Sequence, residues 1–121
     1  DLAAEANERH GRRGAAAVKA AVLVFDGVDE LDVVGPFEVP AMARARGAPV
    51  DVGIVARASI RPVIGIHGMT LVPAGILDDT SDLLIVPGGG WLAGSQRGVR
   101  GEIARGRLPR VVARSAAPGR W

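Results

Sequence analysis

Residues 83–90 read LLIVPGGG, four apolar residues followed by a proline and three glycines. A short apolar run of this kind is typical of a strand buried on both faces of a parallel sheet. Glycine allows the backbone to turn sharply or to approach another group closely. The stretch therefore predicts a buried strand that ends either in a tight turn or in a site built from backbone N–H groups.

Other strands are indicated by short apolar runs elsewhere in the chain. Residues 18–25 and 50–55 have the pattern of buried parallel strands. Residues 60–64 and 69–72 read as strand-like pieces on either side of a hairpin or crossover turn at 65–68. We expect about three parallel strands and a small hairpin, fewer than the roughly five or six strands of a usual sheet.

Two helical stretches separate these runs. The first is expected to begin at Pro36, a residue suited to the first helical position, and to end at Gly47. The second covers residues 91–114, where Pro109 is expected to divide it into two helices. Alternation of short apolar strands with helices predicts an α/β domain with a mostly parallel sheet.

Length and composition fit one small domain. We expect a flexible leader at residues 1–17, the domain at 18–114 and an irregular tail at 115–121. The 121 residues contain no cysteine, which excludes disulfides, thiolate metal sites and thiol catalysis within them. No apolar run approaches the roughly 18 residues of a membrane helix. We therefore expect a cytoplasmic protein without a membrane partner.

Arginine dominates the basic residues, and half of the fourteen arginines lie between Arg97 and Arg120, where Glu102 is the only acid. Such a segment can bind phosphate backbones. A solvated helix face is the simpler alternative, and no aromatic residues interleave with the arginines, so we do not expect nucleic-acid binding. His10 and His67 have no metal-ligand spacing, and we expect neither a metal nor a cofactor; His67 is interpreted as a surface turn residue.

Five acids follow the first predicted strand, in FDGVDELDVVGPFEV at residues 25–39: Asp26, Asp29, Glu30, Asp32 and Glu38. Ligands of open α/β sheets bind outside the carboxyl ends of the strands. Asp32 and Glu38 are each flanked by apolar residues, which predicts partial burial and a role as acid, base or hydrogen-bond partner. Turn formation or exposure on a helix is the simpler interpretation of the others.

VLVFDGVDELDVVGPFEV, residues 22–39, and DDTSDLLIVPGGGW, residues 78–91, together resemble the DJ-1/PfpI family. The similarity is closest to isonitrile hydratases and to the amidotransferase-like domains of AraC-type regulators, and covers residues 18–112. It implies a flavodoxin-like (class I glutamine amidotransferase-like) sandwich, usually dimeric. It also implies a cysteine nucleophile on a strained elbow, an acid from the first loop, and glycine amides in an oxyanion pocket.

The resemblance assigns residues to these roles by position. Asp32 matches the acid, while Glu38 matches a position nearer to a structural helix residue. Gly88 and Gly89 match the pocket glycines, with Gly89 as the amide donor. No cofactor is implied, and the expected partners are a small-molecule substrate or ligand and a second copy of the chain.

The sequence departs from the family at the nucleophile. The cysteine elbow is expected on the strand after the second helical stretch, yet the chain reads RLPRVVARSAAPGRW there, without cysteine. We therefore expect a domain truncated before the nucleophile strand, inactive as it stands, with residues 83–86 as an exposed apolar edge and with marginal stability. Two functions stay open: a domain like isonitrile hydratase or another cysteine-dependent hydrolase or lyase, and the small-molecule sensor of an AraC-type regulator.

Overall fold

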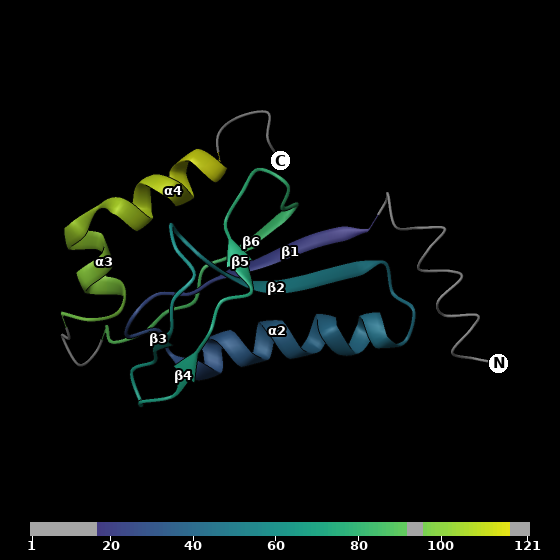
Figure 1. Cartoon of the computed structure of the whole chain (residues 1–121), viewed down its shortest axis with the longest axis horizontal. Coiled ribbons are helices and arrows are strands. Elements are labelled where there is room, and N and C mark those ends of the chain that lie inside the picture. The colour runs from purple at the N-terminus through teal and green to yellow at the C-terminus, as the bar shows by residue number, and fades with distance from the viewer. Residues whose placement is uncertain (1–16, 92–95, 117–121) are drawn as a thin grey trace.

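The computed structural model describes residues 17–91 and 96–116, which form a mostly parallel sheet with flanking helices (Figure 1). The main sheet has the strand order β5-β2-β1-β6, and all its pairings are parallel. Its strands are β1 Val18–Leu23, β2 Val50–Ala56, β5 Gly75–Ile76 and β6 Leu83–Ile85. β3 Val63–Ile64 and β4 Thr70–Leu71 form an antiparallel hairpin. The predicted α/β class is confirmed. Strand β5 was not predicted, because a strand of two residues is too short to show a repeating apolar pattern.

Strand β1 is an inner strand of the sheet, as its apolar sequence predicts. It pairs with β2 from Val18 opposite Val50 onward, and with β6 from Ala20 opposite Leu83 onward. Its last four residues are buried, and Val22 is fully inaccessible to water. The core around β1 is therefore mainly aliphatic, as expected from a sequence that is only 3% aromatic, and Phe25 is the one buried aromatic residue among those described.

Strand β6 lies at the edge of the main sheet. Among the described residues it pairs with β1 alone. Leu83 and Val86 are 48% and 45% exposed. The apolar run at residues 83–86 thus forms an edge with unpaired backbone groups, as the sequence led us to expect.

Helix α2 spans Glu30–Ala45 and runs alongside β1 and β2 (Figure 1). The prediction that it begins at Pro36 was wrong by six residues. Asp29 caps its N-terminus, because Asp29 Oδ1 accepts a hydrogen bond from Leu31 N at 3.0 Å. Pro36 and Pro40 lie inside the helix, where each lacks the N–H that would bond four residues back.

Helices α3 Val99–Arg105 and α4 Arg107–Ser115 lie where β1 and β2 end (Figure 1). The predicted division at Pro109 was wrong, because the helices meet at Gly106. Gly106 has φ +76°, and its N–H donates to Glu102 O at 3.0 Å. Pro109 stands in the first turn of α4, where a backbone N–H needs no partner inside the helix.

The ends of the chain are only partly described. The predicted leader, apart from Ala17, and the predicted tail, apart from residues 115–116, lie outside the described residues. Within residues 17–91 and 96–116, no helix has both the length and the apolar character needed to cross a membrane.

Candidate functional site

Two loops that sequence analysis singled out meet at the carboxyl edge of the sheet. One follows β1 and leads into α2; the other is the glycine loop after β6. Asp29 N donates to Gly88 O at 2.9 Å, and Gly88 N donates to Asp32 Oδ2 at 3.2 Å. The structure therefore brings Asp32 and Gly88 into contact across 56 residues of chain.

Asp32 occupies the third position of α2. An acid here often reaches back to the N–H of the capping residue. Asp29 N donates instead to a carbonyl of the glycine loop, and the Asp32 carboxylate accepts from that same loop. The first turn of α2 is thus tied to residues after β6 by two hydrogen bonds.

The predicted partial burial of Asp32 and Glu38 was wrong, because both are exposed. The residues that flank an acid in sequence point in other directions once the segment is helical. Leu31, for example, is 76% exposed. Glu38 makes no hydrogen bond or ion pair with the described residues, and the structure does not bring it to Asp32 and the glycine loop.

Gly89 makes room for the loop after β1. Its φ is +153°, and a Cβ built there would lie under 3.0 Å from Gly27 O and Asp29 N. Gly98 also packs closely on Gly89, since a Cβ built at Gly98 would lie under 3.0 Å from Gly89 O. Val99 N also donates to Gly89 O, at 2.9 Å. Three segments of chain cross at this point, and glycine allows their backbones to touch.

The amides of the two glycines differ in what they contact. Gly88 N is occupied by the Asp32 carboxylate. Gly89 N, by contrast, donates to no group among the residues that the structure describes. The role of Gly89 as the amide donor stays a prediction from the resemblance.

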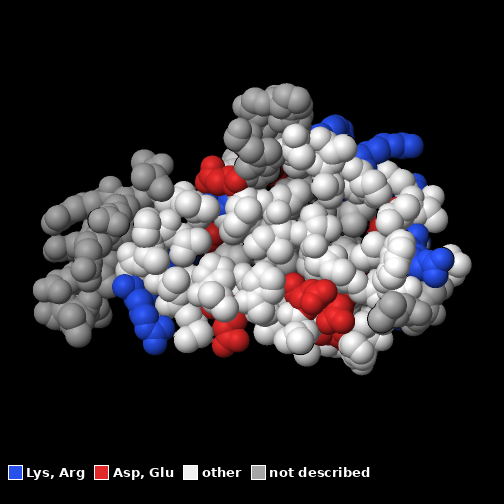
Figure 2. Space-filling view, turned by 180° about the vertical axis from the view of Figure 1, so that it is seen from behind, with Lys and Arg blue, Asp and Glu red and all other residues white. Residues whose placement is uncertain are grey.

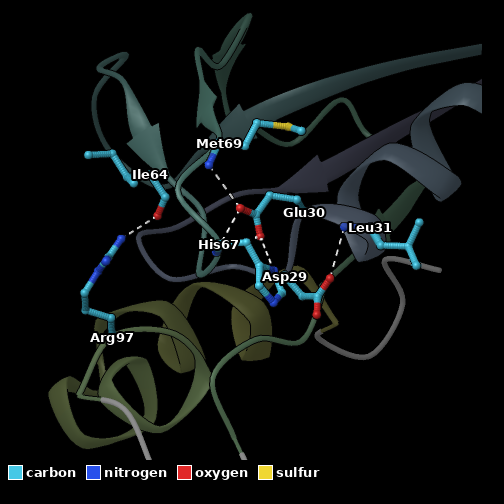
Figure 3. A network of polar contacts seen from close by, with 7 residues as sticks. All are labelled: Asp29, Glu30, Leu31, Ile64, His67, Met69 and Arg97. Carbon is cyan, nitrogen blue, oxygen red and sulfur yellow. Dashed lines mark hydrogen bonds and ion pairs between the residues drawn. The ribbon is translucent and has the colours of Figure 1, made fainter. Parts of the chain in front are cut away.

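Glu30 is the one buried acid in the described part of the chain, and sequence analysis gave it no special role. It is 7% exposed and faces the β3–β4 hairpin (Figure 3). Its Oε2 accepts from His67 N at 2.9 Å and from Met69 N at 3.1 Å, and its Oε1 lies 3.0 Å from His67 Nδ1. Gly65 leaves space for this carboxylate, since a Cβ there would lie under 3.0 Å from it.

These contacts keep Glu30 ionised. Burial acts to raise the pKa of Glu30, but hydrogen bonds from the backbone N–H groups of Met69, Glu30 and His67 and from the His67 ring lower it to about 2. A carboxylate this acidic is a poor proton carrier near neutral pH. Glu30 is better suited to anchoring the hairpin against the first turn of α2.

The hairpin is held from two other directions. Gly27 N donates to Ile64 O at 2.8 Å, and Ile64 N donates to Asp26 Oδ1 at 3.1 Å. An Arg97 guanidinium nitrogen donates to Ile64 O at 2.7 Å (Figure 3). These bonds fix the loop that leads to Asp32.

Asp29, Glu30 and His67 also form the one group of metal-ligand side chains found in the described residues, with ligand atoms within 4.8 Å of one another. No metal-ligand spacing is visible in the sequence, because His67 lies 37 residues from Glu30. The Glu30 oxygens already accept N–H groups, so a cation would compete with the bonds that hold the hairpin. His67 itself is 75% exposed, in keeping with a surface turn.

No family model matches the sequence, and no curated protein matches it either. Among solved structures, the VC2308 protein has a TM-score of 0.47 and 23% identity, over 60% of this chain and 37% of its own. A DJ-1 superfamily protein from Agrobacterium tumefaciens has a TM-score of 0.49 and 16% identity, over 77% of this chain and 49% of its own.

A third structure decides the fold. It is a two-domain protein of Anabaena variabilis with a DJ-1/ThiJ/PfpI-like and a ferritin-like domain. It superposes with a TM-score of 0.52 and 14% identity over 81% of this chain. Ferritin-like domains are helical bundles, whereas this chain contains a parallel sheet. The match therefore lies in the DJ-1/ThiJ/PfpI-like domain. The chain has a DJ-1/PfpI-like fold.

The DJ-1/PfpI-like fold agrees with the flavodoxin-like class predicted from the sequence. The chain spans 27% to 49% of the lengths of these three solved proteins. At such identities the likeness concerns the fold, and function has to be argued from the site.

Proposed function

We propose that Asp32, Gly88 and Gly89 form the acid-and-glycine side of a DJ-1/PfpI-type site for a small polar molecule. The observation that carries this proposal is the 3.2 Å hydrogen bond from Gly88 N to Asp32 Oδ2, which joins the two sequence motifs at the carboxyl edge of the sheet. That edge is where open α/β sheets bind ligands.

The two groups have complementary roles. Gly89 N–H is a fixed donor for a carbonyl oxygen or for a negative charge that develops on it. The Asp32 carboxylate is exposed, and beyond Gly88 N it has lone pairs for a ligand N–H or O–H group. An amide or a similarly polar small molecule would satisfy both.

Within these 121 residues the site has no cysteine to act as nucleophile. We therefore propose a domain that resembles isonitrile hydratase or another cysteine-dependent hydrolase or lyase but does not turn over substrate by itself. The lack of cysteine equally favours the second candidate, the small-molecule sensor of an AraC-type regulator, which binds without turnover.

The binding part of the proposal is tested by NMR with propionamide as probe. We expect its addition to shift the Gly89 amide resonance, and Asp32→Asn to weaken the effect. Glu38→Gln is the matched control, because Glu38 is an exposed acid of the same helix that contacts no site residue. Shifts that avoid Gly89, or that persist unchanged in Asp32→Asn, would contradict the site.

The lack of turnover is tested separately, with propionamide and cyclohexyl isocyanide as substrates. We expect no product above a heat-denatured control. Turnover that disappears in Asp32→Asn would show that the chain is an active enzyme without cysteine, and would overturn this part of the proposal.

We further propose that the folded chain forms a homodimer. Support comes from the β6 edge, whose backbone groups are unpaired among the described residues and whose Leu83 and Val86 are exposed. A location in the cytoplasm, and the lack of a nucleic-acid partner, stay predictions from the sequence.

A further inference from the structure

A cavity of about 240 Å³ opens where β1 and β2 end, beside the start of α4. Four arginines line it: Arg57 and Arg61 after β2, and Arg105 and Arg107 at the junction of α3 and α4. Its position outside the carboxyl ends of parallel strands is a usual place for a ligand in this class of sheet. None of Asp32, Gly88 and Gly89 lines it, so it is separate from the site proposed above.

Among the described residues, the charges of this arginine cavity are only partly balanced. Arg105 is paired with Glu102 at 2.7 Å, and the other lining acid, Asp26, accepts from Ile64 N. Arg57, Arg61 and Arg107 make no hydrogen bond or ion pair with any residue in the described ranges. Guanidinium groups remain charged and hold carboxylate and phosphate groups through paired N–H donors.

The distribution of charge on the surface also favours an anionic ligand. On the face shown in Figure 2, basic side chains gather mainly toward the end of the molecule that carries α3 and α4, while most acidic side chains lie nearer the middle and lower edge. Helix α4 begins at the cavity with Arg107, and no side chain caps its N-terminus. Its positive dipole end adds to the field of the arginines.

One wall of the cavity is apolar. Val24, Phe25 and Leu108 line it, and all three belong to the buried core. A ligand with an apolar body beside its anionic group would cover this wall, whereas a bare inorganic ion would leave it wet. The volume is below the roughly 300–1,000 Å³ of sites for drug-sized ligands, so the ligand is small.

We propose that the arginine cavity binds a small organic anion. Arg57, Arg61 and Arg107 hold its carboxylate or phosphate group, and the apolar body packs on Phe25 and Leu108. This inference does not depend on the function proposed for Asp32 and the glycine loop, since the two sites share no lining residue.

The test uses isothermal titration of the full chain with phenyl phosphate and benzoate, with inorganic phosphate and benzyl alcohol as comparison probes. We expect at least one of the two aromatic anions to bind, more tightly than inorganic phosphate, and benzyl alcohol not to bind. Failure of both aromatic anions to bind at millimolar concentration would overturn the proposal, as would equal binding of benzyl alcohol.

Arg57→Gln and Arg100→Gln form the matched pair of variants. Each removes one positive charge, but Arg100, on α3, lies outside the cavity lining. Arg57 makes no hydrogen bond or ion pair within the described residues, and Arg100 only stacks on the exposed ring of Trp91, so circular dichroism should show both variants folded. We expect Arg57→Gln to weaken binding about tenfold or more, the loss of a charge-assisted hydrogen bond, and Arg100→Gln to leave it nearly unchanged. Equal weakening in both variants would indicate a diffuse basic surface and would overturn the proposal.

Discussion

Gly89→Ala tests most severely whether the glycine loop packs on the loop after β1. A Cβ at this position would lie under 3.0 Å from two backbone atoms, Gly27 O and Asp29 N. Asp29 N is held by its hydrogen bond to Gly88 O, and the residue that carries Gly27 O is held through its own N–H, which donates to Ile64 O. Relief of the overlap requires a backbone shift that breaks at least one of these bonds.

The size of the effect follows from two contributions. Overpacking with backbone shifts costs about 1–3 kcal/mol, and a lost hydrogen bond costs about 0.5–1.5 kcal/mol. We expect Gly89→Ala to lower the free energy of unfolding by about 2–4 kcal/mol, a large part of the roughly 5–15 kcal/mol of a small domain. With a urea slope of about 2 kcal/mol/M, the middle of the range for small proteins, the unfolding midpoint falls by about 1–2 M.

The assay is urea unfolding followed by far-UV circular dichroism, with Gly53→Ala as the matched control. Gly53 lies within β2, and a Cβ there would meet no atom within 4 Å. Alanine in place of this glycine should leave stability unchanged or raise it by about 0.5–1 kcal/mol. If Gly89→Ala proves as stable as Gly53→Ala, the two loops do not cross in contact and the account of the site is wrong.

Three further predictions concern stability and association. Glu30 has an ordinary pKa of 4.5 when free and about 2 when folded, so the stability it contributes is present above pH 4.5 and is lost as pH falls toward 2. Glu30→Gln should therefore be less stable than the native chain in urea unfolding at neutral pH, and the difference in stability between the two should disappear between pH 4.5 and 2. Gly106→Ala should destabilise the fold by about 1–2 kcal/mol because of the left-handed backbone at this position, whereas Pro109→Ala should cost less than about 1 kcal/mol. Thermal unfolding compares the two variants. A larger loss of stability in Pro109→Ala than in Gly106→Ala would contradict the helix break at Gly106. Leu83→Lys on the β6 edge should reduce concentration-dependent association in light scattering, while Val39→Lys, at an exposed position of α2, should not; equal effects would argue against edge pairing.

Elements fixed by local pattern were predictable from the sequence. The apolar pattern of residues 18–25 predicted a strand buried between parallel neighbours, as β1 is. The strand-like pieces on either side of residues 65–68 predicted a hairpin or a crossover turn, and the structure has the hairpin. The sequence placed Asp32 and the glycine loop at the same sheet edge, but it did not predict the hydrogen bond between them.

The predictions that failed concern features that depend on residues far away in the sequence or on competing local signals. Pro36 and Pro109 suggested helix boundaries, but the Asp29 cap and the left-handed Gly106 set the observed ones. The burial of Glu30 required knowledge that residues 65–69 fold over it, which no local period reveals. Asp29, three residues before Asp32, was the available signal for this burial, because an aspartate at that spacing marks a helix start, and that start turns Glu30 inward.

The most direct test of the central claim is the Gly88 amide resonance, followed by NMR in the native chain and in two variants. The account predicts that Asp32→Asn moves this resonance, because Gly88 N donates to Asp32 Oδ2. Glu38→Gln, which removes a charge from the same helix, should leave it in place. A Gly88 resonance that is the same in the native chain and in Asp32→Asn, or that moves equally in both variants, would show that the acid and the glycine loop do not form one site.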